Sequence, residues 1–197
     1  MKQPLDTEAL DQIFHTARTF SNWQDRQVTD KQIQGLYHLL KWGPTSMNCL
    51  PGRFVFLRTP EAKARLEPSL MAGNVAKVRE TPVTVIVAHD ARFYEHLPEL
   101  WPHAPDARGM FASNPALCES TALRNGTLQG AYLILAARAL GLDVGPMSGF
   151  DNAKVDAEFF PDGRFRSNFL ANIGYGEETG LHPRGPRLAF DEAVTLL

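Results

Sequence analysis

The stretch that decides the fold is residues 114–141, NPALCESTALRNGTLQGAYLILAARALG. Asn114 followed by Pro115 is typical of a helix N-cap and the first helical position, and Gly141 is typical of a helix C-terminus. The stretch therefore predicts the longest helix of the chain.

Three small residues inside this helix, Ala122, Gly126 and Gly130, are spaced four apart. This spacing puts them on one smooth stripe, where another backbone can come close. Each glycine inside a helix costs about 1 kcal/mol relative to alanine. We therefore expect the stripe to pack tightly, either against a neighbouring helix or at a subunit interface.

Shorter helices are predicted before this stretch. Thr7 is expected to cap a first helix, and Thr29 with Gln32 forms a capping-box pattern at the start of a second. Thr59 precedes Pro60 as the N-cap of a third helix.

Runs of β-branched and apolar residues predict strands at 53–58, 82–88 and 167–175. Residues 82–88, PVTVIVA, are apolar on both faces, which is typical of a buried strand. Residues 91–114 predict an irregular excursion, either a lid over a site or a packed surface loop. Helices and strands mix without strict βαβ alternation. We therefore expect one α+β domain over residues 1–197, a layered fold with a mixed central β-sheet flanked by helices.

Composition excludes several classes of protein. With 197 residues, 44% of them hydrophobic, the chain can bury a core unaided and is not expected to be disordered. The net charge of −2 is unlike that of proteins that bind nucleic acid through a basic surface. No stretch has the length of a membrane span, and the N-terminus is too acidic for a signal peptide. The isolated Cys49 and Cys118 are typical of a reduced compartment, so a cytoplasmic protein without nucleic-acid or membrane partners is expected.

The signatures of several enzyme classes are missing from the sequence. It contains no P-loop and no H-E-x-x-H zinc motif. His96 and His103 have no third ligand nearby, so no metal site is predicted. A serine-hydrolase elbow at Ser148 fails because Pro146 stands where its first glycine belongs. We predict no catalytic acid or base.

Three polar segments remain as candidates for binding a ligand. Residues 43–54, GPTSMNCLPGRF, form a loop between a helix and a strand. Asn74 and Lys77 lie three residues apart, on the same side of a helix. Residues 145–150, GPMSGF, form a glycine-flanked turn whose backbone amides can donate to a ligand.

Together with ARTFSNW (residues 17–23) and RGPRLAF (residues 184–190), these segments resemble those of the FMN-dependent nitroreductase family. The resemblance covers nearly the whole chain and is closest to the malonic semialdehyde reductase branch. No single motif is specific, but five matches in the correct order are together strong. The resemblance implies the layered fold of that family and an intertwined homodimer with FMN at the subunit interface.

The resemblance also implies which residues hold the phosphate and ribityl chain of FMN. The segment ARTFSNW matches an R-x-S-x-R pattern, although Phe20 replaces its serine and Asn22 its second arginine. The helix with Asn74 and Lys77 would contact the ribityl chain and the pyrimidine edge of the flavin. The segment RGPRLAF would close over the phosphate from the C-terminal side. The residues of the three sets are Arg18, Thr19 and Asn22; Asn74 and Lys77; Arg184 and Arg187.

Two further segments would line the flavin ring. The loop matches P-S-S-x-N-x-Q-P, with Leu50 in place of its glutamine, and the turn matches G-x-x-P-x-x-G-F, whose amides meet flavin N5 and O4. The implied residues are Pro44, Thr45, Ser46 and Asn48 in the loop, and Pro146, Met147, Ser148 and Gly149 in the turn.

The activity implied by the resemblance is a ping-pong cycle. NADH or NADPH reduces FMN at N5, and a second small molecule takes the hydride. In the closest branch that acceptor is malonic semialdehyde, which is reduced to 3-hydroxypropionate. Two alternatives stay open, namely a broad-specificity nitroaromatic or quinone reductase and a flavin-binding module without turnover. The C-terminal arm is expected to reach over the partner subunit, and the stripe at Gly126 to pack long helices across the two-fold axis.

Overall fold

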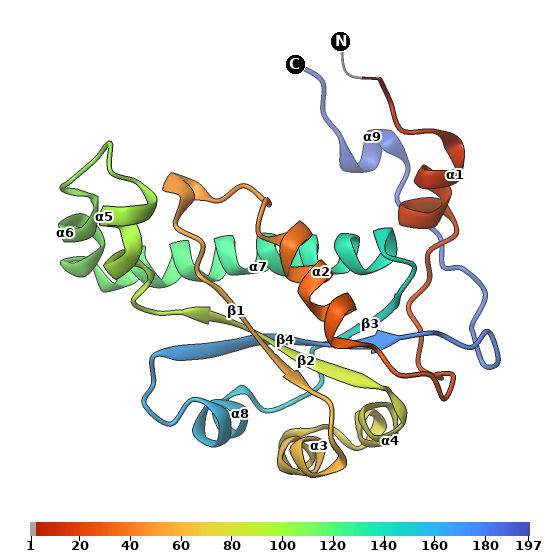
Figure 1. Cartoon of the computed structure of the whole chain (residues 1–197). Coiled ribbons are helices and arrows are strands. Elements are labelled where there is room, and N and C mark those ends of the chain that lie inside the picture. The colour runs from red at the N-terminus through yellow and green to blue at the C-terminus, as the bar shows by residue number, and fades with distance from the viewer. Residues whose placement is uncertain (1–2) are drawn as a thin grey trace.

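The computed structural model describes residues 3–197 and contains one four-stranded sheet (Figure 1). The strand order is β1 (Gly52–Leu57), β2 (Val83–Asp90), β4 (Phe165–Gly174), β3 (Asp143–Met147), and each neighbouring pair is antiparallel. The expected α+β class is confirmed. The ladders are antiparallel rather than mixed, because each connection between neighbouring strands reverses the chain direction. Within the described residues, the isolated bridge between Thr19 and Val144 is the parallel pairing.

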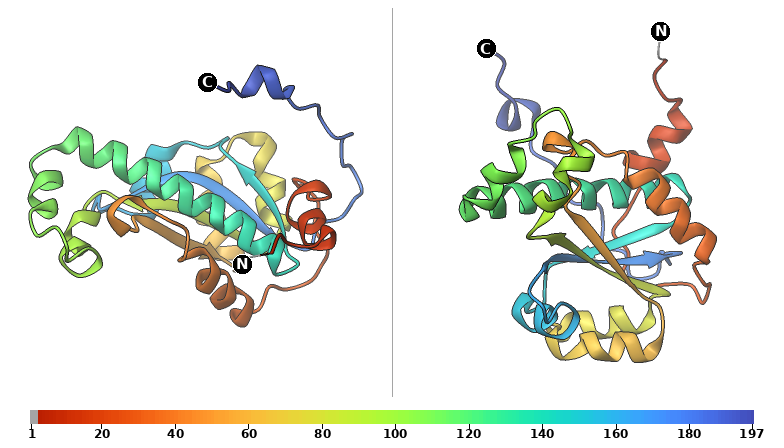
Figure 2. Two further views of the ribbon diagram at one scale, coloured as in Figure 1. Left: turned by 90° about the horizontal axis from the view of Figure 1, so that it is seen from above. Right: turned by 60° about the vertical axis from the view of Figure 1, so that its left-hand side comes forward.

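Helices cover both faces of the sheet (Figure 1, Figure 2). The helices on one face are α2 (Asp30–Leu40) and α7 (Pro115–Ala139), and those on the other are α3 (Pro60–Leu66), α4 (Ala72–Glu80) and α8 (Asn152–Phe159). Every residue of β2 is consequently buried, as its sequence predicts. Alternate residues of β2 join different cores, with Val85 and Val87 under α2 and α7, and Ile86 facing the opposite helices.

Side-chain caps fix where the N-terminal helices begin. The capping box of Thr29 and Gln32 is present as predicted, and Thr59 caps α3. The prediction for Thr7 is wrong. The carboxylate of Asp6 accepts the N–H of Ala9 at 2.8 Å, so α1 (Thr7–Leu10) already includes the threonine. A π-helical turn, Asp11–His15, continues α1.

The long helix α7 lies across the sheet with the predicted ends. Asn114 Oδ1 accepts the N–H of Leu117 at 3.1 Å, and Gly141 has a left-handed φ of 70°. The small-residue stripe faces the sheet of its own chain. A Cβ on Gly130 would lie 2.6 Å from the ring of Phe169, and one on Gly126 would lie 2.9 Å from a side-chain atom of β2. The expected packing against another helix, within or across subunits, is therefore wrong, because helix-on-sheet contact already fills this stripe.

Residues 91–114 are more regular than predicted. They form a 3₁₀ turn, Phe93–His96, and the short helices α5 (Leu97–Leu100) and α6 (Ala107–Ala112). Their apolar side chains surround Cys49 and Cys118 in a separate core cluster. This excursion at one end of α7 is thus a packed subdomain rather than an irregular loop.

An ion-paired network fastens this excursion to the sheet. Asp90 is fully buried at the end of β2. Its Oδ2 accepts from Arg53 Nη2 at 2.8 Å and from Arg164 Nη2 at 3.2 Å, and its Oδ1 accepts the N–H of Arg92 at 2.8 Å. The hydrogen bond with Asp90 raises the pKa of Arg164. The other branch of Arg164 pairs with Glu95 at 3.0 Å, so one buried carboxylate joins two cations and a backbone N–H from three segments.

The C-terminal segment leaves the body of the protein. After β4 it bends back past the N-terminal residues, and residues 182–197, including α9 (Phe190–Ala193), are exposed (Figure 2). Apolar side chains such as Leu188 and Phe190 are therefore uncovered, at 71% and 66% exposure. Among residues 3–197, no helix has the length and apolarity needed to cross a membrane.

Candidate functional site

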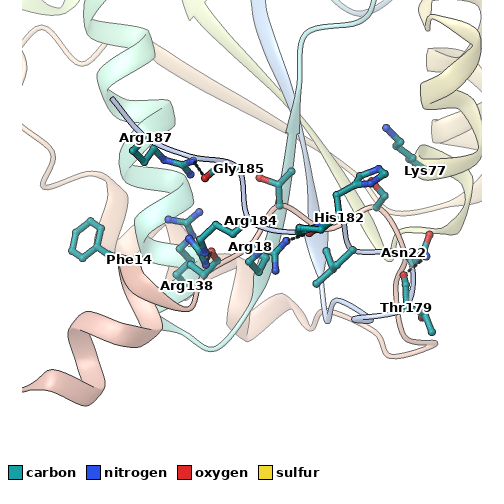
Figure 3. Close-up of a pocket in the computed structure, with 16 residues that line it drawn as sticks. Phe14, Arg18, Asn22, Lys77, Arg138, Thr179, His182, Arg184, Gly185 and Arg187 are labelled. Atoms are coloured by element: carbon teal, nitrogen blue, oxygen red, sulfur yellow. Dashed lines mark hydrogen bonds between the residues drawn. The ribbon is translucent and has the colours of Figure 1, made fainter. Parts of the chain in front are cut away.

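A cavity of about 560 Å³ opens at the C-terminal end of α7 (Figure 3). Its walls come from the segment after α1, from α4, from the last turn of α7 and from the C-terminal segment. The predicted cofactor-binding residues that line it are Arg18, Thr19, Asn22, Lys77, Arg184 and Arg187. The fold thus brings together residues that are more than 160 positions apart in sequence.

Backbone pairing holds the two terminal segments together at this cavity. Residues 19–23 run along the outer edge of β3, where Phe20 N–H donates to Val144 O at 3.4 Å. The side chain of Asn22 donates to Thr179 O at 2.6 Å. Arg18 donates to His182 O, and Arg184 donates to Ala17 O at 2.9 Å. Each of these contacts joins the N-terminal segment to β3 or to the C-terminal segment.

The cavity is strongly cationic. Its 16 lining residues within the described chain include four arginines and a lysine, and none of them is aspartate or glutamate. Figure 3 shows Arg18, Arg138 and Arg184 grouped at one wall, with Lys77 on the α4 side. Burial lowers the pKa of Arg138; Asp143 opposes this effect and Arg184 adds to it. Such a surface attracts a polyanion, most strongly a phosphate, which guanidinium groups bind in a bidentate manner.

The predicted residues of α4 and of the turn after β3 contact one another beside this cavity. Asn74 Nδ2 donates to Gly149 O at 3.0 Å, and Lys77 Nζ donates to Asn74 Oδ1 at 3.4 Å. A Cβ on Gly149 would lie 2.6 Å from the Asn74 amide, so this close approach requires glycine.

The predicted extent of that turn is wrong. Residues 143–147, which include Pro146 and Met147, form strand β3 and pair with β4, because the backbone stays extended until Ser148. The turn itself is short, with Phe150 N–H donating to Ser148 O at 3.0 Å. Ser148 is exposed next to Asn74 and Gly149, while Met147 packs into the core.

The predicted loop residues Pro44, Thr45, Ser46 and Asn48 lie elsewhere in the chain. Ser46 N–H donates to Asn125 Oδ1 at 2.8 Å, near the middle of α7. Asn125 and Arg138 are separated by 13 residues, which is about 20 Å along a helix. The fold of a single chain therefore does not bring this loop to the cationic cavity.

This loop is also conformationally unusual. Met47, Asn48 and Leu50 have φ values of 52°, 49° and 39°, a region that residues other than glycine rarely adopt. The strain is sustained by surrounding hydrogen bonds, including Asn48 Nδ2 to Leu100 O at 3.1 Å. Strained backbone of this kind concentrates at ligand-binding loops.

Sequence reasoning missed several residues of the cavity, above all Arg138. The sequence did contain an indication of its importance, because Arg138 is a charged residue in the apolar second half of α7, and charged residues are rarely buried without a partner. His182 and Thr179 carried no such signal, since they lie in an exposed polar segment. No group of three or more histidine, cysteine, aspartate or glutamate side chains in the described part of the chain could hold a metal ion.

Comparison with known proteins gives consistent matches. A family model described as "Nitroreductase family" matches residues 1–175. A Burkholderia lata protein named "Putative NADH dehydrogenase/NAD(P)H nitroreductase" is 62% identical over 98% of this chain and 98% of its own length. A Rhodopseudomonas palustris protein with the same name is 58% identical over the full length of both chains.

A similar fold is found in the crystal structure of an Exiguobacterium sibiricum protein described as a "putative nitroreductase in complex with FMN". The TM-score between that structure and this chain is 0.87. The two chains are 20% identical, and the match covers 100% of each.

Proposed function

The chain belongs to the nitroreductase family, and from this premise we propose that it is an FMN-dependent NAD(P)H oxidoreductase. Two full-length relatives carry an NAD(P)H nitroreductase name, and a protein of the same fold was solved with FMN. The observation that carries the proposal is the cationic cavity, because its donor set matches the most highly charged part of that cofactor.

The residues present fit the phosphate end of FMN. The cavity offers guanidinium groups from both chain ends and lacks acidic lining residues within the described chain. Arg18 and Arg184 each use one nitrogen to hold backbone carbonyls, which keeps their side chains at the wall. These residues with Arg187 would hold the phosphate, and Thr19 and Asn22 would offer polar groups to the ribityl chain.

The α4 side of the cavity fits the flavin ring. When bound, FMN supplies the redox chemistry, since it accepts a hydride from a nicotinamide and returns it to a second substrate. Lys77, half buried and aligned by Asn74, places a positive charge on this side. That charge would stabilise an anionic ligand edge, and the exposed Ser148 beside it would offer further polar contacts. No side chain stands out as a proton donor.

A second copy of the chain would complete this site. The strained loop around Ser46 lies about 20 Å from the cavity along α7, so we place it at the site of a partner protomer. Apolar side chains are exposed on the outer faces of α2 and α7 and in the turn directly after α2, where a partner would cover them. They are Tyr37, Leu39, Trp42, Leu117, Leu123, Leu128 and Tyr132.

Strand β1 offers the partner an edge. It ends the sheet on one side, and a groove of about 790 Å³ lined by Phe54, Phe56 and Tyr37 runs beside it. The exposed C-terminal segment with Leu188 and Phe190 has the apolar character that would fill such a groove on a second copy. Light scattering of the purified protein should give the mass of a dimer. A monomer that binds FMN at full strength would contradict this arrangement.

For the acceptor we propose nitroaromatic or quinone compounds, and the nitroreductase names of the relatives support the first of these two classes. None of the relatives named above is called a malonic semialdehyde reductase, so that narrower acceptor stays a prediction. The specificity constants for a nitroaromatic compound and for malonic semialdehyde, measured with one enzyme preparation, separate the two.

The first experiment is the visible absorption spectrum of the purified protein, followed by anaerobic NADH or NADPH. A yellow protein that bleaches supports the proposed oxidoreductase. Bound FMN that resists both nicotinamides supports a binding module without turnover. Protein that stays colourless after incubation with FMN would overturn the proposal.

A further inference from the structure

Arg138 is an unusual cation because it stands in the last turn of α7, in the largely apolar second half of that helix. Its side chain is half buried, and its Nη1 donates to Ile13 O at 3.0 Å. Its Nε is buried and has no hydrogen-bond partner within the described residues. The ion pairs found in residues 3–197 do not include Arg138.

The cationic neighbours of Arg138 make its partial burial less favourable. Arg18, Arg184 and Arg187 line the same cavity, and a half-buried guanidinium without a counter-ion is unfavourable. Asp143 lies near enough to act on Arg138 electrostatically, but its carboxylate accepts the N–H of Gly176 at 2.8 Å. An anion in the cavity would balance this charge.

We infer that Arg138 binds the phosphate group of the flavin and makes the site select FMN over riboflavin. The inference rests on the proposed function and adds a residue to it. Nη1 is anchored to Ile13 O and Nε is buried, so Nη2, which has no hydrogen-bond partner within residues 3–197, is the donor left for a phosphate oxygen in the cavity that Arg138 lines. Since arginine forms strong charge-assisted hydrogen bonds with phosphate oxygens, a guanidinium held in place by Ile13 O is matched to that ligand.

Its position in the fold gives Arg138 a role that the other arginines do not share. Arg184 and Arg187 belong to the exposed C-terminal segment, whereas Arg138 is part of a 25-residue helix packed on the sheet. A donor on a rigid element loses little conformational entropy when it binds. Arg138 is therefore the fixed contact to which the arginines of the exposed C-terminal segment add.

The test compares two flavins on apo protein stripped of its cofactor. Dissociation constants for FMN and riboflavin are measured by flavin fluorescence for the wild type, Arg138→Gln and Arg138→Lys. We expect Arg138→Gln to weaken FMN binding about 10- to 100-fold, the range for losing a hydrogen bond to a charged group. Riboflavin binding should change less than about twofold, and Arg138→Lys should lie between the wild type and Arg138→Gln, because it keeps the charge but not the fork.

Arg65→Gln is the matched control, because Arg65 is an exposed arginine of α3 paired with Glu158. It should bind both flavins like the wild type. If Arg138→Gln weakened FMN and riboflavin equally, the residue would act by holding Ile13, and the inference would fail while the proposed function stood. Unchanged FMN affinity would overturn it in the same way. A wild-type protein that binds neither flavin would overturn both.

Discussion

Arginines gather near both ends of α7, and the two groups differ in what surrounds them. Near the N-terminal end, Arg53 and Arg164 converge on the buried carboxylate of Asp90. At the C-terminal end, Arg18, Arg138 and Arg184 converge on a cavity whose described lining residues include no carboxylate. The first group is electrically complete within the chain and stabilises the fold. The second requires an anion from outside, which is why we place ligand binding there.

The largest loss of stability is expected from a substitution in the ion-paired network around Asp90. Asp90→Asn would leave two arginines beside a buried neutral side chain, and should lower the free energy of unfolding by about 3 kcal/mol. Asp30→Asn is the control, since that carboxylate pairs with Arg58 at the surface, and it should cost less than about 1 kcal/mol. Urea unfolding of both variants measures the difference, and equal losses would refute the distinction between the two ends of α7.

A second prediction tests the helix that joins the two ends. Gly130→Ala should destabilise the protein by about 2 kcal/mol, because its Cβ would lie 2.6 Å from the Phe169 ring. Gly73→Ala, in α4, has open space around the new atom and should stabilise by up to about 1 kcal/mol. Thermal and urea unfolding test whether Gly130→Ala lowers the stability and Gly73→Ala raises it. A neutral Gly130→Ala variant would mean that the sheet yields to α7.

The third prediction addresses the unpaired end. Arg184→Gln should weaken FMN binding about tenfold, equivalent to about 1.4 kcal/mol, because it removes a cation from the cavity. The free energy of unfolding of the apo protein should change by less than about 0.5 kcal/mol, since Arg184 is exposed. Lys154→Gln, an exposed cation of α8, should change neither quantity. A stability loss without an affinity loss would assign Arg184 to the fold.

The smallest effect concerns pH near the paired end. Burial lowers the pKa of His89, Arg166 adds to the effect, and Asp156, Glu119 and Asp90 oppose it. The unfolded chain therefore takes up a proton near pH 6.5 that the folded chain resists, so stability falls as the pH drops below this value. This residue alone contributes at most about 1.4 kcal/mol per pH unit.

His89→Gln should remove that part of the pH dependence. Urea unfolding at pH 7.5 and pH 5.5, for the wild type and the variant, measures it. The variant should lose less stability than the wild type between the two values. Parallel losses would mean that His89 does not control acid stability.

Sequence reasoning succeeded where local chemistry decides the outcome. The capping box at Thr29, the ends of α7 at Asn114 and Gly141, and the buried strand β2 all follow from short-range patterns. Sequence reasoning failed where the packing of a residue depends on a partner that is distant in the sequence. The stripe at Gly130 was matched to another helix, because spacing alone does not say whether a helix or a sheet approaches it.

At the candidate site, too, the sequence identifies some residues and misses one whose role depends on distant partners. Motif positions predict Arg18, Arg184 and Lys77 as cofactor-binding residues, and all three line the cavity. Arg138 was missed because its importance comes from Arg18 and Arg184, which are far from it in sequence. Its place in the apolar half of α7 is visible in the sequence, but its grouping with the other two arginines is visible only in three dimensions.

The contacts that close the cationic cavity also determine when it can form. Arg18 bonds to a residue 164 positions later, Asn22 to one 157 positions later, and Arg184 to one 167 positions earlier. Closing such long loops comes late in folding, since the entropy lost is recovered only after the core has formed. During synthesis the ribosome must release nearly the whole described chain before the two segments can meet. The sheet and the buried Asp90 network need the chain only as far as residue 174, so they can form before the contacts of Thr179, His182 and Arg184 create a place for an anion.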